Sequence, residues 1–589
     1  MDEITLLLDQ DKDLITLIQK ASLLNAIQHK GKAQAGAILG KIIVEKQDLK
    51  AKIKELSKLI NQIIAEINKL SIDEQKQIVI DKWPEALNKE KKIEKKSLPP
   101  LANIEKYASI VTRFSPNPDC VLHLGSARAI ILSHEYARKN NGKFILRFED
   151  TDPKVKQPIL EFYEKIREDL AWLGCNVDAE YIQSDRLPIY YEYAHKLLSQ
   201  GNAYVCKCVP DDFRRKIIKN QACNCRVLAI EKNLERWNLM LKGSYLAGEA
   251  VVRIKTDINH PNPAVRDWPA LRIIDNEKFP HPRVGSKYHV WPLYNIAAGI
   301  DDHLMGITHI IRGKEHLTNA VRQKYMYAYL GWNYPETIHY GRLKITGAYL
   351  SKSKIVQGVK EGVYTGWDDP RLATFVALKK RGITPESIKK MIIDVGPKTA
   401  DVTLSWENLY SHNRKIIDLQ SNRYFLVLNP IKLRVKGVPS TFKVNLKLHP
   451  QRSEKGFRKY TIVPKGDLKT ATFWIDKNDI VSLSKGSVLR LMDLFNVEFE
   501  NVCGNFVEAS FNSGSYAEAR KSKSKFIHWI SQGEELPCTV VMPNTKINEG
   551  IAESACKNLK PDTIIQFERF GFVRVHQNDK KLVAYYSHK

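Results

Sequence analysis

The sequence has no apolar run of about 18 residues, the length that a membrane-spanning helix needs. Its first residues, MDEITLLLDQDKD, are acidic and lack the basic stretch and small-residue cleavage site of a secretory signal. Cysteine is scarce, at 9 of 589 residues, which argues against a disulfide scaffold and fits a reducing compartment. These absences predict a cytoplasmic protein without a membrane span.

Acidic residues are outnumbered by basic ones, 66 to 92, which gives a net charge of +26. Such an excess suits a protein that binds a polyanion, because neutralised phosphates supply much of nucleic-acid affinity. A general abundance of lysine in the source organism would give the same value. The glycine-rich motifs GxGxxG and GxxxxGKS are also missing, which excludes the dinucleotide-binding and P-loop classes.

A strand–helix–strand unit is the clearest pattern that is present. Residues 109–114 and 143–148 predict two short strands, and two prolines end the first by removing N–H donors. Between them, apolar residues recur at helical spacing from His123 to a C-cap at Asn140-Asn141-Gly142. The unit predicts parallel strands joined by a right-handed crossover.

The turn before this helix carries His123, Gly125 and Ser126. Unpaired N–H groups and the positive end of the dipole attract phosphate to a helix start, and a histidine can donate a hydrogen bond to it. Gly125 would let a nucleotide approach the backbone closely. A purely structural N-terminal capping arrangement is the alternative interpretation.

A second element lies far downstream, at Leu350-Ser351-Lys352-Ser353-Lys354, after a predicted strand at 338–345. A Ser/Lys loop can bring a cation onto a triphosphate and neutralise the charge that develops as pyrophosphate leaves. The pattern is weak on its own, because Lys521–Lys525 repeats it in a solvated or RNA-facing basic run.

In this order the two motifs resemble the HIGH and KMSKS signatures of class I aminoacyl-tRNA synthetases. The surrounding segments resemble archaeal-type glutamyl-tRNA synthetases, the branch that shares its C-terminal half with glutaminyl-tRNA synthetases; they read RFSPNPDCVLHLGSARA, RFEDTDP, DDHLMGITHIIRGKEH and GWDDPRL. The resemblance covers residues 104–589. It departs from the family at Cys120, where glycine is usual, and at Tyr349, which replaces the first lysine of KMSKS.

The resemblance implies a role for each of several residues. A carboxylate such as Glu149 can hold an ammonium group, and a buried arginine binds a carboxylate at two points; an ion pair at the sheet edge is the alternative for Glu149. The implied glutamate-binding residues are Arg113, Ser115, Asn117, Glu149, Tyr294 and Arg312; the nucleotide-binding ones are His123, Gly125, Glu315, His316, Leu350, Ser351, Lys352 and Ser353; and the catalytic ones are His123, Gly125, Ser126 and Lys352.

Arg312 is the residue that the resemblance assigns to reading the substrate side chain. Glutamyl enzymes place arginine there to pair with the γ-carboxylate, whereas glutaminyl enzymes have a small uncharged residue. A buried guanidinium that faced a neutral amide would lose its charge partner. An ion pair of Arg312 with Glu315 or Asp302 is the structural alternative.

Four of the cysteines, Cys206, Cys208, Cys223 and Cys225, form a CxC…CxC set. Four thiolates from two short hairpins can make a closed, tetrahedral Zn²⁺ site of the structural kind. Two buried reduced pairs, or one redox-labile pair, are the alternatives.

The predicted fold is multidomain, α/β followed by all-β. By resemblance we expect a Rossmann-type catalytic domain with an acceptor-binding insertion, then a helical stem-contact module and two anticodon-binding β-barrels, which period-two alternation supports. Trp367-Asp368-Asp369-Pro370 predicts the start of a helix over Arg371–Lys380. The expected boundaries are a helical N-terminal appendage at 1–88 (helices Ile4–His29, Gly36–Leu70 and Asp73–Leu87), a basic linker at 89–103, the catalytic halves at 104–183 and 288–345, the insertion at 184–287, the signature loop and stem-contact module at 346–424, and the barrels at 425–589.

The predicted function is glutamate–tRNA ligase. With ATP and Mg²⁺ the protein would activate L-glutamate and transfer it to the terminal adenosine of tRNA-Glu, with tRNA-Gln an open second acceptor, and it would act as a monomer. The alternatives are a glutaminyl-tRNA synthetase, a catalytically silent tRNA-binding paralogue, and a small-molecule nucleotidyltransferase, which the serine at 126 in place of the second histidine of HxGH disfavours.

Overall fold

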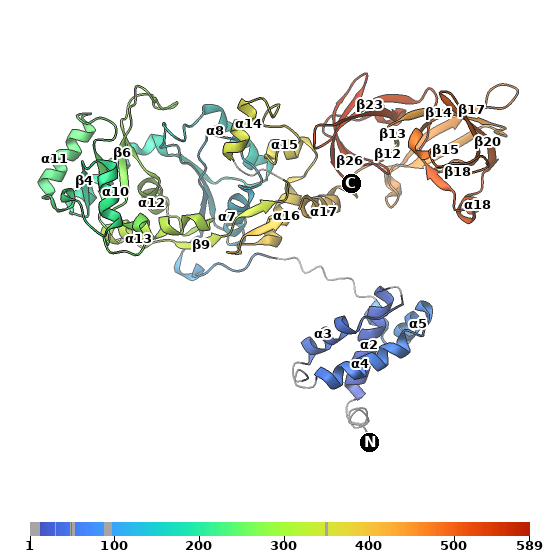
Figure 1. Ribbon diagram of the computed structural model, residues 1–589, viewed down its shortest axis with the longest axis horizontal. Helices are drawn as coiled ribbons and strands as arrows, with labels where there is room; N and C mark the ends of the chain where they lie inside the picture. The colour runs from blue at the N-terminus through green and yellow to red at the C-terminus, as the bar shows by residue number, and fades with distance from the viewer. Residues whose placement is uncertain (1–11, 30, 47–48, 50–52, 88–96, 348–351) are drawn as a thin grey trace. The chain divides into compact units, whose positions relative to one another are not determined.

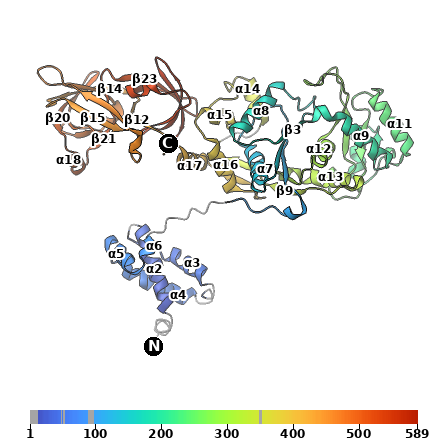
Figure 2. The ribbon, with the colours of Figure 1, turned by 180° about the vertical axis from the view of Figure 1, so that it is seen from behind.

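The protein is described by a computed structural model, and the described residues are 12–29, 31–46, 49, 53–87, 97–347 and 352–589 (Figures 1 and 2). They form two compact units, one within residues 1–96 and one at 97–589. No helix in the described ranges is long and apolar enough to cross a membrane.

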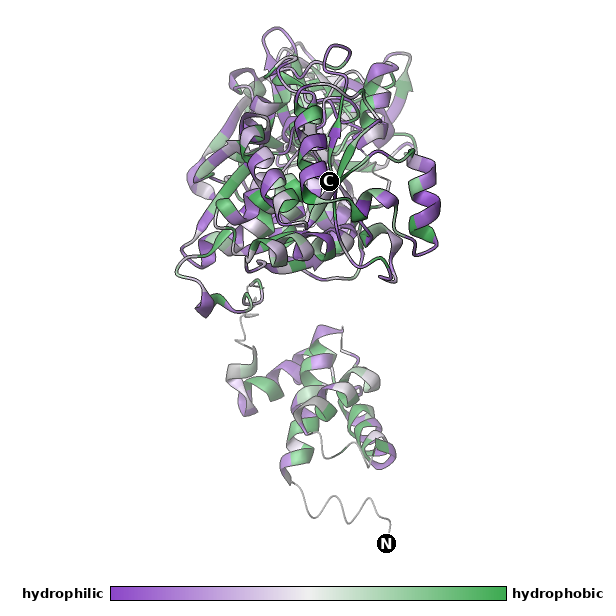
Figure 3. Cartoon of the chain, turned by 90° about the vertical axis from the view of Figure 1, so that its left-hand side faces the viewer, coloured by the Kyte–Doolittle hydropathy of each residue, from purple (hydrophilic) through white to green (hydrophobic). Residues whose placement is uncertain are grey.

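The first unit is a small helical bundle. Both α3 and α4 pack against α2, with Ile18, Ile42 and Ile60 fully buried among them. Figure 3 shows that each helix carries hydrophobic and hydrophilic residues. The helices are α2 (Lys12–Gln28), α3 (Ala35–Glu45), α4 (Ile53–Ile67), α5 (Ile72–Lys82) and α6 (Pro84–Leu87).

The single helix predicted over Gly36–Leu70 is wrong, because the chain forms α3 and α4 there. Both helices bury an apolar stripe on α2, so the helical period continues on either side of the break and hides it. Residues 4–11 of the first predicted helix, and residues 89–96 of the predicted linker, lie outside the described ranges.

The second unit begins with a parallel nucleotide-binding sheet. β1 (Val111–Phe114), β2 (Lys143–Phe148) and β3 (Ala179–Ile182) are parallel neighbours, joined by α7 (Ala127–Lys139) and α8 (Leu160–Trp172). β8 (His309–Gly313) lies beside β1, where the Thr308 N–H donates to the Val111 carbonyl at 3.0 Å, and β8 pairs in parallel with β9 (Glu336–Tyr340) across α13 (Leu317–Leu330). The order β3-β2-β1-β8-β9 confirms the Rossmann-type prediction.

The strand predicted over 338–345 is interrupted. β9 ends at Tyr340, and β10 (Leu343–Ile345) leaves to pair with β11 (Val402–Leu404). Gly341 between them lies against another stretch of backbone, since an added Cβ would collide with the Ala400 carbonyl oxygen. This close crossing, which the sequence pattern does not reveal, splits the strand.

An insertion with its own antiparallel sheet separates the two halves of the nucleotide fold. Its strands are β4 (Ala203–Cys206), β5 (Val251–Ile254), β6 (Pro269–Ile273) and β7 (Val290–Pro292), and its helices are α9 (Leu187–Ser199), α10 (Pro210–Ile218) and α11 (Ile230–Leu241). Because β7 pairs with β6, the sheet runs to Pro292 and not to the predicted boundary at 287. The chain then returns to the nucleotide fold through α12 (Tyr294–Leu304).

A helical module follows, with α14 (Lys352–Lys360), α15 (Phe375–Lys380), α16 (Pro385–Val395) and α17 (Trp406–Ile417). The helix predicted from Arg371 starts only at Phe375. Asp369 is the reason, because its carboxylate accepts hydrogen bonds from Arg371 and from the Thr365 N–H and closes a turn there. Thr374 caps α15 instead, accepting from the Ala377 N–H.

The C-terminal part confirms the predicted barrels. It has two seven-stranded sheets, in the orders β12-β25-β26-β27-β23-β24-β13 and β21-β18-β19-β20-β14-β17-β22, beside a separate β15-β16 hairpin. In each sheet the two outermost strands are consecutive in sequence, separated by Phe425 in one and by His528 and Trp529 in the other, so each sheet curls until its ends meet.

The bounds of these strands are as follows. The first sheet has β12 (Arg423–Tyr424), β13 (Leu426–Val427), β23 (Glu535–Val541), β24 (Ile547–Glu553), β25 (Ile564–Phe567), β26 (Gly571–Asn578) and β27 (Leu582–His588). The second has β14 (Pro430–Lys436), β17 (Ala471–Asp476), β18 (Val488–Leu491), β19 (Asn496–Cys503), β20 (Phe506–Ser513), β21 (Lys525–Ile527) and β22 (Ile530–Ser531). The hairpin is β15 (Phe442–Lys447) with β16 (Phe457–Ile462), and α18 (Tyr516–Lys521) is the one α-helix among these described strands.

Candidate active site

A cavity of about 160 Å³, here called the strand-end cavity, opens at the carboxyl ends of β1, β2 and β8. Parallel strands bring the residues that follow them to one edge of a sheet, which is where α/β folds bind ligands. Seven of the residues singled out in the sequence meet here: Arg113, Ser115, Glu149, Tyr294, Arg312, Glu315 and His316.

Arg312 lies on β8 with 5% of its surface exposed. Its guanidinium donates to the hydroxyl of Tyr294 at 3.2 Å, to the side-chain oxygen of Gln323 at 3.2 Å and to the hydroxyl of Tyr334 at 3.0 Å. Among the described residues no carboxylate lies within 4.0 Å of it, so the ion pair considered with Glu315 or Asp302 is not formed. A buried cation with only neutral partners is suited to binding an anion.

Asp302 forms ion pairs with two other arginines of the site, Arg113 and Arg147. Its carboxylate accepts from Arg113 at 3.0 Å and from Arg147 at 2.7 Å, and Arg147 also pairs with Glu149 at 2.9 Å. Although burial opposes ionisation, Arg113 and Arg147 hold the pKa of the Asp302 carboxyl below its ordinary value. Burial raises the pKa of the Glu149 carboxyl, and the same guanidiniums offset part of that effect.

Asp302 was not among the predicted site residues. The one sequence signal for it is the pair of adjacent acids in the otherwise apolar helix YNIAAGIDDHL. Arg113, which was expected to meet a substrate carboxylate, already holds the carboxylate of Asp302 through Nε and Nη2.

The His123 turn joins β1 to α7. The Gly125 N–H donates to His123 Nδ1 at 3.0 Å, so in the neutral ring the proton is on Nε2, which remains the donor. Burial lowers the pKa of His123, which keeps the ring neutral at neutral pH. Ser126 is the N-cap residue of α7, but its hydroxyl makes no capping hydrogen bond. The turn can therefore offer a neutral N–H donor to a phosphate oxygen.

Lys352 is the first residue of α14, and its ammonium contacts the carboxylate of Asp119. Burial lowers the pKa of Lys352 to about 8, whereas the adjacent carboxylate favours the charged form, so Lys352 is a cation at neutral pH. Leu350 and Ser351, like Tyr349, lie outside the described residues.

A larger cavity of about 760 Å³, here called the α14 cavity, is lined by Lys352, Ser353, Asn117 and Asp119, together with lysines 154, 156 and 360. Asn117 thus lines this cavity and was expected to line the amino-acid pocket. Its amide donates to the Lys156 carbonyl at 3.2 Å, while its side-chain oxygen is buried without a hydrogen-bond partner among the described residues. The two cavities together offer one anion site for a small molecule and a cationic space of nucleotide size.

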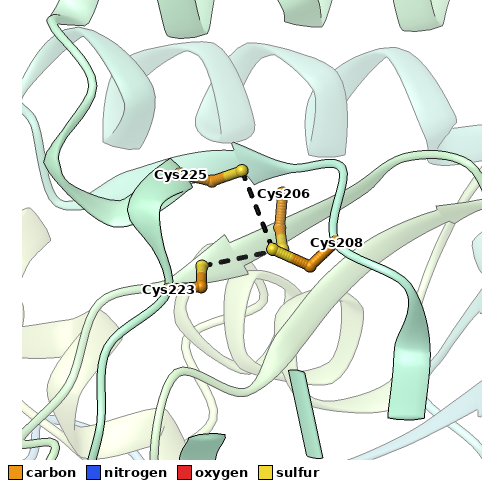
Figure 4. A group of neighbouring side chains, drawn as sticks. All are labelled: Cys206, Cys208, Cys223 and Cys225. Atoms are coloured by element: carbon orange, nitrogen blue, oxygen red, sulfur yellow. Dashed lines mark hydrogen bonds between the residues drawn. The ribbon is translucent and has the colours of Figure 1, made fainter. Parts of the chain in front are cut away.

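The four clustered cysteines face one another in the insertion, as Figure 4 shows. Their sulfurs all lie within 4.8 Å of one another, with Cys206 and Cys223 at 3.8 Å and Cys208 and Cys225 at 4.0 Å. A tetrahedral site with Zn–S bonds of about 2.3 Å places its sulfurs about 3.8 Å apart. The hydrogen bond between Cys206 and Cys223 lowers the pKa of Cys223 and raises that of Cys206, so without a metal the two sulfurs share a proton that a bound metal would displace. The donor set fits a structural zinc ion.

Comparisons with known proteins identify the family of the chain. Residues 109–419 match the model of the catalytic domain of class I tRNA synthetases (E and Q), and residues 421–513 and 526–576 match two models of the anticodon-binding domain of the same group. A glutamate–tRNA ligase of Thermococcus kodakarensis is 50% identical over 98% of this chain and 100% of its own length, and one of Pyrococcus abyssi is 51% identical over 97% and 99%.

Among solved structures, a glutamate-tRNA synthetase of Elizabethkingia anophelis matches 53% of this chain and 72% of its own, at 24% identity and a TM-score of 0.39. The family of the chain is shown by the match to the catalytic-domain model and by the relatives of about 50% sequence identity. The chain therefore belongs to the class I tRNA synthetases of the glutamyl and glutaminyl group.

Proposed function

We propose that the protein is a glutamate–tRNA ligase, which joins L-glutamate to tRNA-Glu at the expense of ATP. The observation that carries the choice of amino acid is Arg312, a buried guanidinium at the strand-end cavity whose described partners are all neutral. A neutral glutamine amide would leave that charge uncompensated, whereas the glutamate γ-carboxylate pairs with it. Relatives at about 50% identity over the whole chain carry the name glutamate–tRNA ligase, which supports the same activity.

In this proposal the strand-end cavity holds the amino acid. Arg312 and Tyr294 bind the γ-carboxylate, and Glu149 binds the α-ammonium group. Arg113, fixed by Asp302, keeps one nitrogen, Nη1, for the α-carboxylate. Ser115 has a buried hydroxyl without a partner among the described residues, which is available to the substrate.

ATP would enter with Mg²⁺, which neutralises part of the phosphate charge. An oxygen of the α-carboxylate of glutamate attacks the α-phosphorus of ATP. The bond from that phosphorus to the oxygen that bridges to the β-phosphate breaks, and pyrophosphate leaves. His123 donates from Nε2 and Lys352 supplies positive charge to the phosphates, while Gly125 and Ser126 form the turn against which the nucleotide lies. Glu315, His316, Ser353, and Leu350 and Ser351 of the undescribed segment, are proposed nucleotide contacts.

The acyl group then passes to tRNA. A hydroxyl of the terminal adenosine attacks the carbonyl carbon of glutamyl-adenylate and AMP leaves. The insertion would bind the acceptor end, with its fold held by Zn²⁺ on Cys206, Cys208, Cys223 and Cys225. The barrels would bind the anticodon. We further propose that the protein acts as a monomer in the cytoplasm, with tRNA-Gln as the second acceptor to be tested.

The test is acylation of purified tRNA-Glu and tRNA-Gln with each amino acid, together with pyrophosphate exchange in the presence of ATP and tRNA. Exchange that depends on glutamate supports the proposal. Exchange with glutamine alone would identify a glutaminyl enzyme, and the absence of exchange with either amino acid would identify a catalytically silent tRNA-binding protein.

A further inference from the structure

One short helix, α15, is bonded at one end to the His123 turn. The Leu124 N–H donates to the Ala373 carbonyl at 2.8 Å, and the Phe375 N–H donates to the Leu122 carbonyl at 3.1 Å. Thr374 is thereby paired with His123 across an antiparallel bridge and is fully buried. Any displacement of the start of α15 therefore acts directly on the backbone that carries His123.

The other end of α15 is bonded to the last strand of the barrels. Arg381, with 2% of its surface exposed, donates from Nη2 to the Ser587 carbonyl at 3.0 Å, and its Nε lies 3.5 Å from the Tyr586 carbonyl oxygen. It also donates to the hydroxyl of Tyr410 on α17 at 2.7 Å. None of these partners is a carboxylate, so this buried guanidinium is held by carbonyl oxygens of the C-terminal strand and by a phenol.

Gly382, the residue after Arg381, is also held in place by neighbours from α17 and the barrels. Asn413 donates to the Gly382 carbonyl at 3.0 Å and lies 3.0 Å from Nε2 of His588. Gly382 has φ +81°, and an added Cβ would stand 3.2 Å from the Cβ of Arg574 on β26. Figures 1 and 2 both show α15 to α17 between the nucleotide-binding sheet and the barrels, with the C-terminus beside α17.

We propose that Arg381 is a positioning residue that couples the barrels to the His123 turn through α15. The helix has only six residues, about 9 Å of rise, so it moves as a unit and carries a shift at Arg381 to the turn. RNA docked on the barrels thereby changes turnover at a centre that Arg381 itself does not touch. The proposal rests on the glutamate–tRNA ligase function and adds to it the route by which the distant half of the tRNA is sensed.

The experiment measures kcat and KM for aminoacylation with two tRNA-Glu transcripts, one natural and one with a substituted anticodon nucleotide. In the unmodified protein the substitution lowers kcat as well as raising KM. In Arg381→Gln, kcat for the natural transcript falls about 3- to 30-fold and no longer depends on the anticodon, while KM still does. Tyr410→Phe, which removes one partner of Arg381, shifts kcat in the same direction by less, and Arg381→Lys restores part of the dependence.

Arg414→Gln is the matched control. Arg414 also bonds to the C-terminal segment, at the Lys589 carbonyl, but it does so from α17 and not through α15, so its loss leaves the kcat ratio of the two transcripts unchanged. Thermal unfolding and binding of the natural transcript are measured for every variant.

Three results would overturn the coupling. The first is an Arg381→Gln protein that keeps the kcat ratio of the unmodified protein, and the second is an equal loss of kcat with both transcripts, which a structural role alone produces. The third is an unmodified protein whose kcat does not depend on the anticodon. Failure of the ligase function is distinguished from all of these, because then the unmodified protein makes no glutamyl-tRNA from the natural transcript.

Discussion

Arg312 and Tyr294 stand 3.2 Å apart beside the strand-end cavity, a guanidinium that donates to a phenol oxygen. Each comes from a different element, Arg312 from β8 and Tyr294 from the first position of α12. Because the phenol carries no charge, the positive charge of Arg312 remains for a ligand, and this relationship makes the choice of amino acid testable.

Replacing Arg312 by alanine should lower kcat/KM for glutamate by at least about 100-fold, because the γ-carboxylate would be buried without its partner. Tyr294→Phe should cost only about 2- to 10-fold, the effect of one neutral hydrogen bond. Pyrophosphate exchange at varied glutamate concentration measures both. An Arg312→Ala protein that still prefers glutamate over glutamine would mean that another residue reads the side chain.

Lys352→Ala should lower kcat for glutamate activation by about 100-fold with a smaller change in KM for ATP, because the charge is needed most when pyrophosphate leaves. Single-turnover formation of glutamyl-adenylate measures this step. Lys523→Ala is the control, since Lys523 belongs to the second Ser/Lys run, just after α18 in the C-terminal part, and should leave the rate unchanged. An equal loss in both variants would refute a specific role for Lys352.

The purified protein should contain one zinc ion per chain by elemental analysis. Cys223→Ser should lose the metal and weaken acylation more than pyrophosphate exchange, because the cysteines lie in the insertion and not at the strand-end cavity. Cys538→Ser, a change of a buried cysteine on β23, should keep the metal. If the purified protein contained no zinc and all four clustered cysteines reacted as free thiols, the zinc prediction would be wrong and the cluster would be two reduced pairs.

Asp169 gives a pH dependence of stability. Burial raises the pKa of its carboxyl to about 7 from an ordinary 3.8, so the folded protein binds the proton more tightly than the unfolded chain. The stability that this contributes is complete below about pH 4 and is lost as the pH rises to about 7. Asp169→Asn should therefore raise Tm at pH 8 by about 2–5 °C and change it little at pH 4.

Asp178→Asn is the opposite control. Although burial opposes ionisation, hydrogen bonds from Arg138 and from the Phe144 N–H hold the pKa of Asp178 below its ordinary value. Its stabilisation is present above the unfolded pKa and is lost as the pH falls through the folded one, so this variant should lower Tm at pH 8. Scanning calorimetry at pH 4 and pH 8 measures the Tm of both variants. A change in Tm of the same sign for both variants at pH 8 would contradict this account.

Short-range patterns predicted β1, α7 and β2 with nearly correct bounds, since period, prolines and the asparagine-rich end all act within a few residues. The start of α15 was predicted at Arg371, four residues too early, because Asp369 and the proline after it are typical of a helix start. In the structure the Asp369 carboxylate instead accepts a hydrogen bond from Arg371 and closes a turn.

The interior of the site was the part least accessible to sequence reasoning. Asp302 holds Arg113 and Arg147 across 189 and 155 residues of chain, and no local pattern reports such a pair. Arg312 was found because a family resemblance marks that position. Its partners, Gln323 on α13 and Tyr334 in the loop before β9, are brought to it only by the folded arrangement of these segments around β8.

The outermost strands of the two barrel sheets also bear on pairing between strands of different protein molecules. Strands β12, β13 and β22 have two residues each and β21 has three, so the outermost strands of both sheets are too short to serve as templates for a strand of another molecule. The two seven-stranded sheets therefore offer little free edge for aggregation by strand addition.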